Sequence, residues 1–424
     1  MVPADATIAE LRCAVCGRSY RPGEVEYTCP ACGQAGTLDV LYDYDALRRA
    51  ISRDDLASSA EPSMWRYRAL LPLRPGAAVP PLVAGGTPLY AAPRVAAALG
   101  CAQVWIKDDG RNPTGSLKDR ASALIVARAV AEGIRVVTTA STGNAAAALA
   151  GLAASVGLLA VIFVPEAAPE AKIAQLLTYG AIVLLVKGNY DNAFDLAVAA
   201  AERYGWYNRN TGMNPYTIEG KKTVAFEIAE QLGWRMPDAV VVSVGDGNII
   251  SAVHKGFRDL RALGWIDRIP RLIGVQAEGS AACYQAWKTG ADPATMAPIH
   301  AETVADSIAA DLPRDRVKAV RAVRETEGAF VGVPDDAILA AIPLLARQSG
   351  VFAEPAGAAA YAGALAALES GVLSASDRVA LIVTGSGLKD IRSAMRVAGS
   401  GYPVAPDPEE VEKVRVALGL PALK

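Results

Sequence analysis

The sequence shows no marked excess of charge of either sign. In 424 residues, 42 lysines and arginines face 44 aspartates and glutamates, so the formal net charge is −2. A chain that binds nucleic acid or an anionic membrane surface is expected to be basic, and we therefore expect neither partner. Charged residues make up 20% of the chain and apolar residues 52%, which is a globular and not a disordered composition.

The sequence also lacks the marks of a secreted or membrane-spanning protein. Residues 1–6 contain no basic segment followed by an apolar run, so no secretory signal is expected there. Residues 136–165 carry no charge and are long enough to span a bilayer, but they include six hydroxyl or amide side chains and three glycines. This pattern favours a buried strand, a helix and a second strand. We expect a soluble cytoplasmic protein.

Cysteine is scarce, and four of the six cysteines lie close to the N-terminus. They form two CxxC pairs with twelve residues between them: Cys13, Cys16, Cys29 and Cys32. Two such turns can wrap one tetrahedral ion, and a segment this short needs a metal to supply its folding free energy. We predict a structural zinc site with four protein ligands. Unpaired surface cysteines or a redox pair are the alternative.

From about residue 104 onward, expected strands and helices alternate. The expected strands are 104–107, 135–139, 158–164, 181–186, 239–244, 271–276 and 378–384. The expected helices are 118–132, 144–156, 168–179, 190–204 and 249–263. Strands separated by helices predict an α/β fold with parallel sheets covered on both faces. Ligands of such folds lie on the loops that follow the strands.

Residues 112–120, NPTGSLKDR, place a lysine at the start of an expected helix. Ser116 is the expected N-cap, and Asp119 three residues later would supply the acid of a capping box. Lys118 is then either an ordinary exposed residue of a first helical turn or the nucleophilic amine of a covalent cofactor site.

Three more loops rich in glycine and hydroxyl groups follow expected strands. Residues 141–144 leave backbone amides free at a helix N-terminus, where they either bind a carboxylate or simply cap the helix. Residues 245–248 can cradle a phosphate with backbone amides, but they lack the third glycine of a dinucleotide-binding motif. Residues 384–390 place a hydroxyl group where it can meet a ring nitrogen.

Six motifs, taken in order, resemble those of the fold-type II pyridoxal-phosphate enzymes, and most closely their threonine synthase branch. They are GGTPL at 85–89, NPTGSLKDR at 112–120, STGN at 141–144, EGKKT at 219–223, EPAGA at 354–358 and TGSGLKD at 384–390. The resemblance implies two three-layer domains with parallel sheets and the site between them. It also implies a zinc ribbon at 1–40, a large domain at 41–125 and 216–424, a small mobile domain at 126–215, and a homodimer.

The same resemblance implies residue roles. Lys118 would hold pyridoxal 5′-phosphate covalently and move protons. Asn144 would bind the 3′-oxygen of the cofactor, and Thr384 would contact its pyridine nitrogen. The cofactor phosphate would lie on Gly245, Asp246, Gly247 and Asn248. The substrate carboxylate would lie on Ser141, Thr142 and Gly143. Arg209 and Lys221 are candidates for the substrate phosphate, with a surface loop as the alternative.

The chain departs from the threonine synthase pattern at two positions. Ser386 stands where that branch commonly has histidine, and Ile249 ends a phosphate loop that usually reads closer to GNxGN. The resemblance implies conversion of O-phospho-L-homoserine and water to L-threonine and phosphate. The alternatives are β-elimination or β-replacement on serine, threonine or O-phosphoserine, and a non-catalytic ligand-binding paralogue. The chain has only two histidines, so no nearby substitute for the missing one is expected.

Overall fold

The computed structural model describes residues 8–141, 143–166, 168, 170–188 and 190–421. The chain begins with a small antiparallel sheet in the order β2-β1-β3. Its strands are β1 (Ile8–Cys13), β2 (Ser19–Tyr20) and β3 (Leu38–Tyr42). We call residues 8–42 the ribbon. Helices α1 (Tyr44–Ala50) and α2 (Arg53–Ser58) and a 3-10 helix (Met64–Leu70) then lead into the main body.

The larger sheet has six strands in the order β12-β11-β10-β13-β5-β4. All neighbours run parallel except the edge strand β4, which pairs antiparallel with β5. The strands are β4 (Leu89–Ala91), β5 (Gln103–Asp108), β10 (Ala239–Ser243), β11 (Arg271–Ala277), β12 (Ala329–Val333) and β13 (Arg378–Val383). The sheet is therefore mixed, where the sequence predicted a parallel one.

Helices cover both faces of this sheet because successive strand residues point to opposite sides. Val241 packs into one core together with α3 (Pro93–Leu99), α13 (Asp335–Ser349) and α14 (Pro355–Glu369). Val240 and Val242 pack into the other core with the helices of the opposite face. These are α9 (Thr223–Gln231), α10 (Asn248–Ala262), α11 (Ala282–Thr289) and α12 (Arg316–Glu325).

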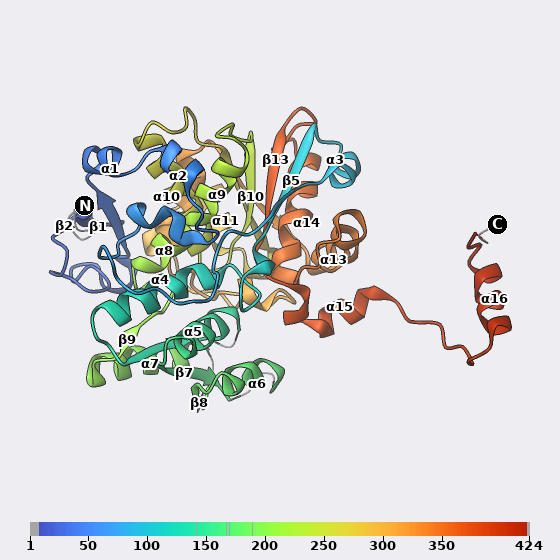
Figure 1. Cartoon of the computed structure of the whole chain (residues 1–424), viewed down its shortest axis with the longest axis horizontal. Coiled ribbons are helices and arrows are strands. Elements are labelled where there is room, and N and C mark those ends of the chain that lie inside the picture. The colour runs from blue at the N-terminus through green and yellow to red at the C-terminus, as the bar shows by residue number, and fades with distance from the viewer. Residues whose placement is uncertain (1–7, 142, 167, 169, 189, 422–424) are drawn as a thin grey trace.

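The smaller sheet has four parallel strands in the order β8-β7-β6-β9. They are β6 (Val136–Ala140), β7 (Leu159–Pro165), β8 (Ile182–Val186) and β9 (Tyr207–Asn208). Its helices are α5 (Asn144–Ala154), α6 (Glu170–Thr178) and α7 (Tyr190–Tyr204). Helices α4 (Lys118–Ala131) and α8 (Tyr216–Lys221) connect it to the larger sheet. Figure 1 shows the smaller sheet below the larger one.

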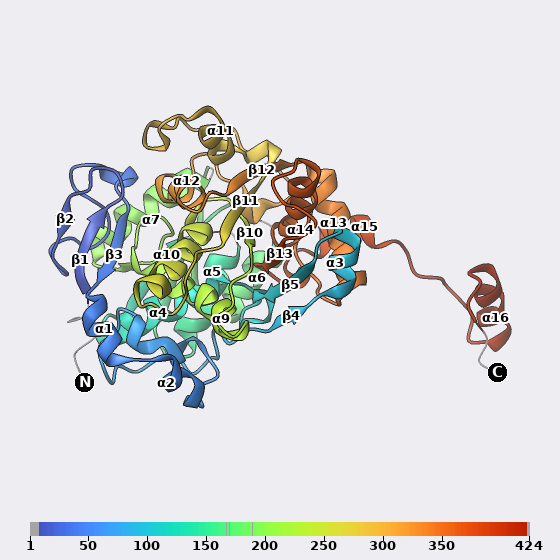
Figure 2. The ribbon, with the colours of Figure 1, turned by 90° about the horizontal axis from the view of Figure 1, so that it is seen from above.

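The ribbon lies against the main body, beside α10 and α12 (Figure 2). At the other end of the chain, α15 (Ile391–Ala398) packs against α13, whereas α16 (Pro408–Ala417) stands away on an extended segment (Figure 1). Across the described ranges, no helix is both long and apolar enough to cross a bilayer. The predicted α/β fold class is confirmed, and the expected elements from residue 104 onward match the observed ones to within about two residues.

Candidate active site

Two cavities meet at Lys118. The larger has a volume of about 410 Å³ and the smaller about 50 Å³. Both are lined by Lys118, Thr211, Asp246 and Ser307. The wall of the larger cavity includes the residues that follow β6, and the wall of the smaller one the residues that follow β10. The two cavities therefore lie at the carboxyl ends of strands from both sheets, as expected of a ligand site in an α/β fold.

The turn before Lys118 is held by backbone bonds and by Asp119. The Asp119 carboxylate accepts from the backbone nitrogen of Thr114 at 2.9 Å and from its hydroxyl at 2.6 Å. The backbone nitrogen of Leu117 donates to the carbonyl of Thr384 at 2.9 Å. The hydroxyl of Ser116 is buried and has no hydrogen-bond partner among the described residues. The predicted capping role of Ser116 is therefore wrong, because Asp119 turns to Thr114 instead.

Lys118 is half-buried, so the exposed-lysine alternative is not what the structure shows. Burial lowers the pKa of its amine below the usual range, the nearby Glu354 carboxylate opposes that shift, and the Arg209 guanidinium adds to it. A lowered pKa leaves more of the amine neutral, and a neutral amine is the nucleophilic form.

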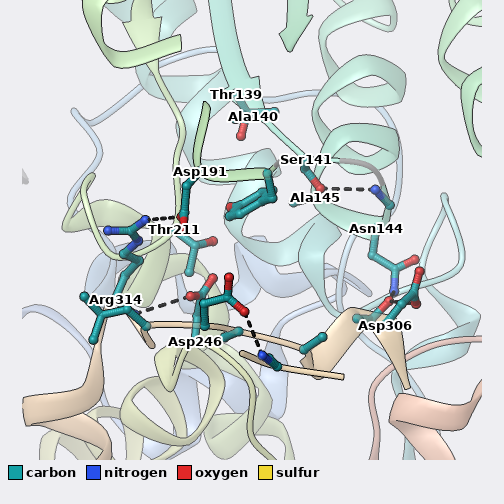
Figure 3. Close-up of a pocket in the computed structure, with 18 of the residues that line it drawn as sticks. Thr139, Ala140, Ser141, Asn144, Ala145, Asp191, Thr211, Asp246, Asp306 and Arg314 are labelled. Carbon is teal, nitrogen blue, oxygen red and sulfur yellow. Dashed lines mark hydrogen bonds and ion pairs between the residues drawn. The ribbon is translucent and has the colours of Figure 1, made fainter. Parts of the chain in front are cut away.

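The STGN motif forms one wall of the larger cavity. Ser141 and Asn144 line it at the start of α5 (Figure 3). Gly143 also lines it, whereas Thr142 lies outside the described residues. The side-chain amide of Asn144 donates to Glu354 at 2.7 Å. The free backbone amides of a helix N-terminus suit an anionic group such as a carboxylate.

The loop Gly245–Gly247 and the first residue of α10, Asn248, line the smaller cavity. A Cβ atom built on Gly245 would come within 2.7 Å of the Ile308 backbone, and Gly247 has a left-handed φ of 85°. Both positions therefore need glycine. This narrow cradle at the N-terminus of a helix has the backbone donors that a phosphate group requires, so the residues present fit the cofactor phosphate.

Two buried cations lie beside these cavities, and no carboxylate of the described residues is hydrogen-bonded to either. Arg209 donates to the hydroxyls of Ser122 at 3.1 Å and Thr211 at 2.8 Å, while its Nη2 has no hydrogen-bond partner within the described part of the chain. Lys221 lines the smaller cavity and donates to the Asn248 side chain. The surface-loop alternative is wrong for both residues, which are fully buried.

Desolvation affects both cations strongly. It lowers the pKa of Arg209 to about 10, against the weaker opposite influence of Tyr190. It lowers the pKa of Lys221 well below the ordinary lysine value, and repulsion from Arg209 and Lys118 lowers it further. Buried cations of this kind are stabilised when an anion binds next to them.

The remaining predicted residues lie near the cavities in different ways. Thr384 is buried and its hydroxyl lies 3.5 Å from that of Ser243, which lines the smaller cavity. The Asp246 carboxylate accepts from the backbone nitrogen of Arg314 at 3.3 Å (Figure 3), so its charge is turned toward that donor. Burial nevertheless raises its pKa.

Sequence reasoning missed one wall of the larger cavity. Residues 300–314 contribute His300, Asp306, Ser307, Asp311 and Arg314 to its lining. The segment follows no expected strand and carries no periodic pattern, so nothing in the local sequence pointed to it. One of the two histidines, His300, is among these lining residues.

The four predicted ribbon cysteines come together. Their sulfur atoms all lie within 4.8 Å of one another, and all four are free thiols. Gly17 and Gly33, which follow the two pairs, have left-handed φ angles of 71° and 58°, as tight turns around an ion require. The arrangement is compatible with a bound metal ion.

Comparison with known proteins gives the class first. Residues 81–385 match the family of pyridoxal-phosphate dependent enzymes, and the chain belongs to that family. The match includes Lys118, the STGN motif and the loop 245–248. The structure is of the fold-type II class, as the sequence predicted.

Individual relatives show which members of the family this chain is similar to. Threonine synthase of Methanocaldococcus jannaschii is 39% identical over 389 residues, covering 91% of this chain and 94% of the relative. Threonine synthase of Methanosarcina acetivorans is 40% identical over 388 residues, with the same coverage. Among solved structures, threonine deaminase isoform 2 of Solanum lycopersicum matches with 25% identity and a TM-score of 0.61, covering 74% of this chain and 84% of that one.

Proposed function

We propose that this protein is a threonine synthase, a lyase that converts O-phospho-L-homoserine and water to L-threonine and phosphate. The observation that carries the proposal is the position of Lys118, at the junction of a small phosphate-sized cavity and a larger one. The sequence relatives support the same activity, because they match nearly the whole chain at about 40% identity.

The proposed residue roles follow from the two cavities. Lys118 holds the cofactor, whose pyridine ring, when bound, withdraws electrons from the substrate Cα. Asn144 and Thr384 orient the ring, and Ser141, Thr142 and Gly143 bind the substrate carboxylate. The amine of Lys118 would also accept and donate protons at the substrate.

The two buried cations divide between the two phosphates. Lys221 lies in the smaller cavity with Gly245–Asn248, so we assign it to the cofactor phosphate, together with these backbone donors. Arg209 lines the larger cavity, and its buried Nη2 has no hydrogen-bond partner among the described residues, so we assign it to the phosphate of the substrate. This differs from the sequence-based expectation, in which both cations met the substrate.

The test is phosphate release from O-phospho-L-homoserine and from O-phospho-L-serine, measured side by side with analysis of the amino-acid product. We expect release from the homoserine ester with threonine formed. The Lys118→Ala variant should lose the visible absorbance of the bound cofactor and about 10³-fold or more of the rate. Lys288→Ala, an exposed lysine near Tyr284, is the matched control and should keep both.

Release from the serine ester alone would favour β-elimination or β-replacement. Cofactor binding without turnover of either ester would favour a ligand-binding protein. Each outcome would contradict the threonine synthase proposal.

The proposal has three further parts. The ribbon cysteines hold one structural zinc ion. Residues 126–215 form a small domain that moves against the large domain of residues 41–125 and 216–424, closing the cavity between them. The enzyme acts as a homodimer in the cytoplasm, and light scattering on the purified protein tests the oligomer.

A further inference from the structure

The ribbon contacts two helices whose ends are hydrogen-bonded to Asn248, a residue that lines the smaller cavity. Both contacts come from one strand, β3, through the side chains of Asp39 and Tyr42. They reach α12 and α8, which lie on either side of Asn248. Since Asn248 opens the helix at the proposed phosphate loop, these contacts join the ribbon to the cofactor site.

The first contact is a partly buried ion-pair cluster with α12. The Asp39 carboxylate lies 3.3 Å from Lys318 Nζ and 2.5 Å from Arg321 Nη2. Lys318 also donates to the carbonyl of Leu38 at 2.7 Å, and its side chain is only 3% exposed. Burial by itself would raise the pKa of Asp39, but Lys318 and Arg321 lower it below its usual value. The cluster therefore keeps Asp39 ionised and ties β3 to the first turns of α12.

The start of α12 in turn holds the phosphate loop. Asp315 accepts from the Asn248 side-chain amide at 2.5 Å, and its backbone nitrogen donates to the carbonyl of Asp246 at 2.8 Å. Lys318 lies 3.9 Å from the other oxygen of Asp315. Lys318 therefore stands between two carboxylates, one in the ribbon and one that holds the loop.

The second contact is with α8. The hydroxyl of Tyr42 donates to Glu219, and Lys222 Nζ lies 4.3 Å from the centre of the Tyr42 ring. Lys222 also donates to Glu219. Helix α8 ends at Lys221, whose amine donates to the side-chain oxygen of Asn248. The nitrogen of the Asn248 side-chain amide is thus bonded to Asp315 at the start of α12, and its oxygen to Lys221 at the end of α8. Strand β3 contacts both helices.

We propose that Asp39 and Tyr42 are positioning residues through which the ribbon sets the shape of the cavity that takes the cofactor phosphate. This inference rests on the proposed cofactor role of the loop 245–248. If Asp39 loses its charge, Lys318 is left buried with Asp315 as its nearest carboxylate. Lys318 then attracts the Asp315 carboxylate more strongly and competes with the Asn248 amide for it. The phosphate cavity, which Asn248 lines, changes its shape as a result.

The experiment titrates cofactor-free enzyme with pyridoxal phosphate and, separately, with pyridoxal, which lacks the phosphate. The variants are Asp39→Asn and Tyr42→Phe. The control is Glu10→Gln, also in the ribbon, where the glutamate pairs with Arg12 on its own strand. Thermal melting confirms that each variant folds. If Asp39→Asn fails to fold, Tyr42→Phe, which removes only a hydroxyl, carries the test.

We expect the dissociation constant for pyridoxal phosphate to rise about tenfold in Asp39→Asn and several-fold in Tyr42→Phe. The constant for pyridoxal should stay within twofold in both, since the contacts act on the phosphate cavity alone. Glu10→Gln should match the wild-type protein with both ligands, and kcat at saturating cofactor should change little.

Unchanged affinity for pyridoxal phosphate in the folded variants overturns the inference. An equal loss of affinity for pyridoxal, or the same loss of affinity in Glu10→Gln, also overturns it. Either result would mean that the substitution loosens the protein in general and does not act on the phosphate cavity. A wild-type chain that binds no pyridoxal phosphate contradicts the proposed function itself. The two failures are therefore distinguishable.

Discussion

Asp119 follows the proposed cofactor lysine directly and is fully buried, yet no cation is hydrogen-bonded to it in the described structure. Burial raises its pKa from the ordinary value of 3.8 to about 6, although the hydrogen bonds from Thr114 oppose the shift. The charged form is thus disfavoured in the folded state. Below pH 4 the carboxyl is neutral in both folded and unfolded chains, and above pH 6 it is charged in both.

This shift predicts a stability difference that depends on pH. Between pH 4 and 6 the folded state binds more protons than the unfolded state, so the contribution of Asp119 to stability falls as pH rises. A pKa shift of about two units corresponds to a change of about 3 kcal/mol in the free energy of unfolding. In the Asp119→Asn variant, which does not titrate, the melting temperature relative to wild type should rise between pH 4 and pH 7. A difference that stays constant over this range would show that Asp119 has an ordinary pKa.

The helices around the site pack closely because glycine occurs where two backbones meet. Gly220, within α8, lies so near α4 that a Cβ atom built on it would come 2.3 Å from the carbonyl of Arg120. Helix α8 ends at Lys221, and α4 begins at Lys118, so this close approach sets the distance between the two lysines. The EGKKT motif can be recognised in the sequence, but its glycine is needed because the backbone of α4 lies against it.

Gly220→Ala is therefore expected to destabilise the protein by roughly 2 kcal/mol, although alanine is the better helix former in isolation. The clash also pushes α8 away from α4, which should weaken cofactor binding. Thermal melting and cofactor titration measure the two effects. Gly401→Ala is the control, since a Cβ atom there meets nothing within 4 Å among the described residues. If Gly220→Ala is as stable as Gly401→Ala, the close contact between α8 and α4 is contradicted.

In the whole molecule, the ribbon is joined to the body through charged and polar contacts of β3 and is proposed to fold around its own metal ion. We predict about one zinc ion per chain by elemental analysis. Cys29→Ser should lose the metal and lower the melting temperature, because metal binding contributes to folding. Cys101→Ser, outside the ribbon, should keep the metal. A freshly purified chain without metal would contradict the zinc proposal, and so would full metal content in Cys29→Ser.

The sequence by itself determined the elements, because hydrophobic periodicity and glycine-rich turns are local signals. It placed seven strands and five helices from residue 104 onward, the four cysteines and the order of the six motifs, but it did not predict elements such as β12, α8 or α12. Likeness to the pyridoxal-phosphate enzymes and their threonine synthase branch, predicted from those motifs, is confirmed by the relatives. Motifs such as NPTGSLKDR are contiguous, so they can be recognised without the fold.

Only the tertiary structure decided which distant residues share the site. It buried Arg209 and Lys221 beside Lys118, brought the segment 300–314 and His300 to the cavity, and joined Asp39 of the ribbon to α12. It also turned the Asp119 carboxylate toward Thr114 and left the Ser116 hydroxyl without the capping bond expected of it. These features depend on desolvation and on contacts between segments up to 282 residues apart, as for Arg321 and Asp39, and no local pattern encodes such distances.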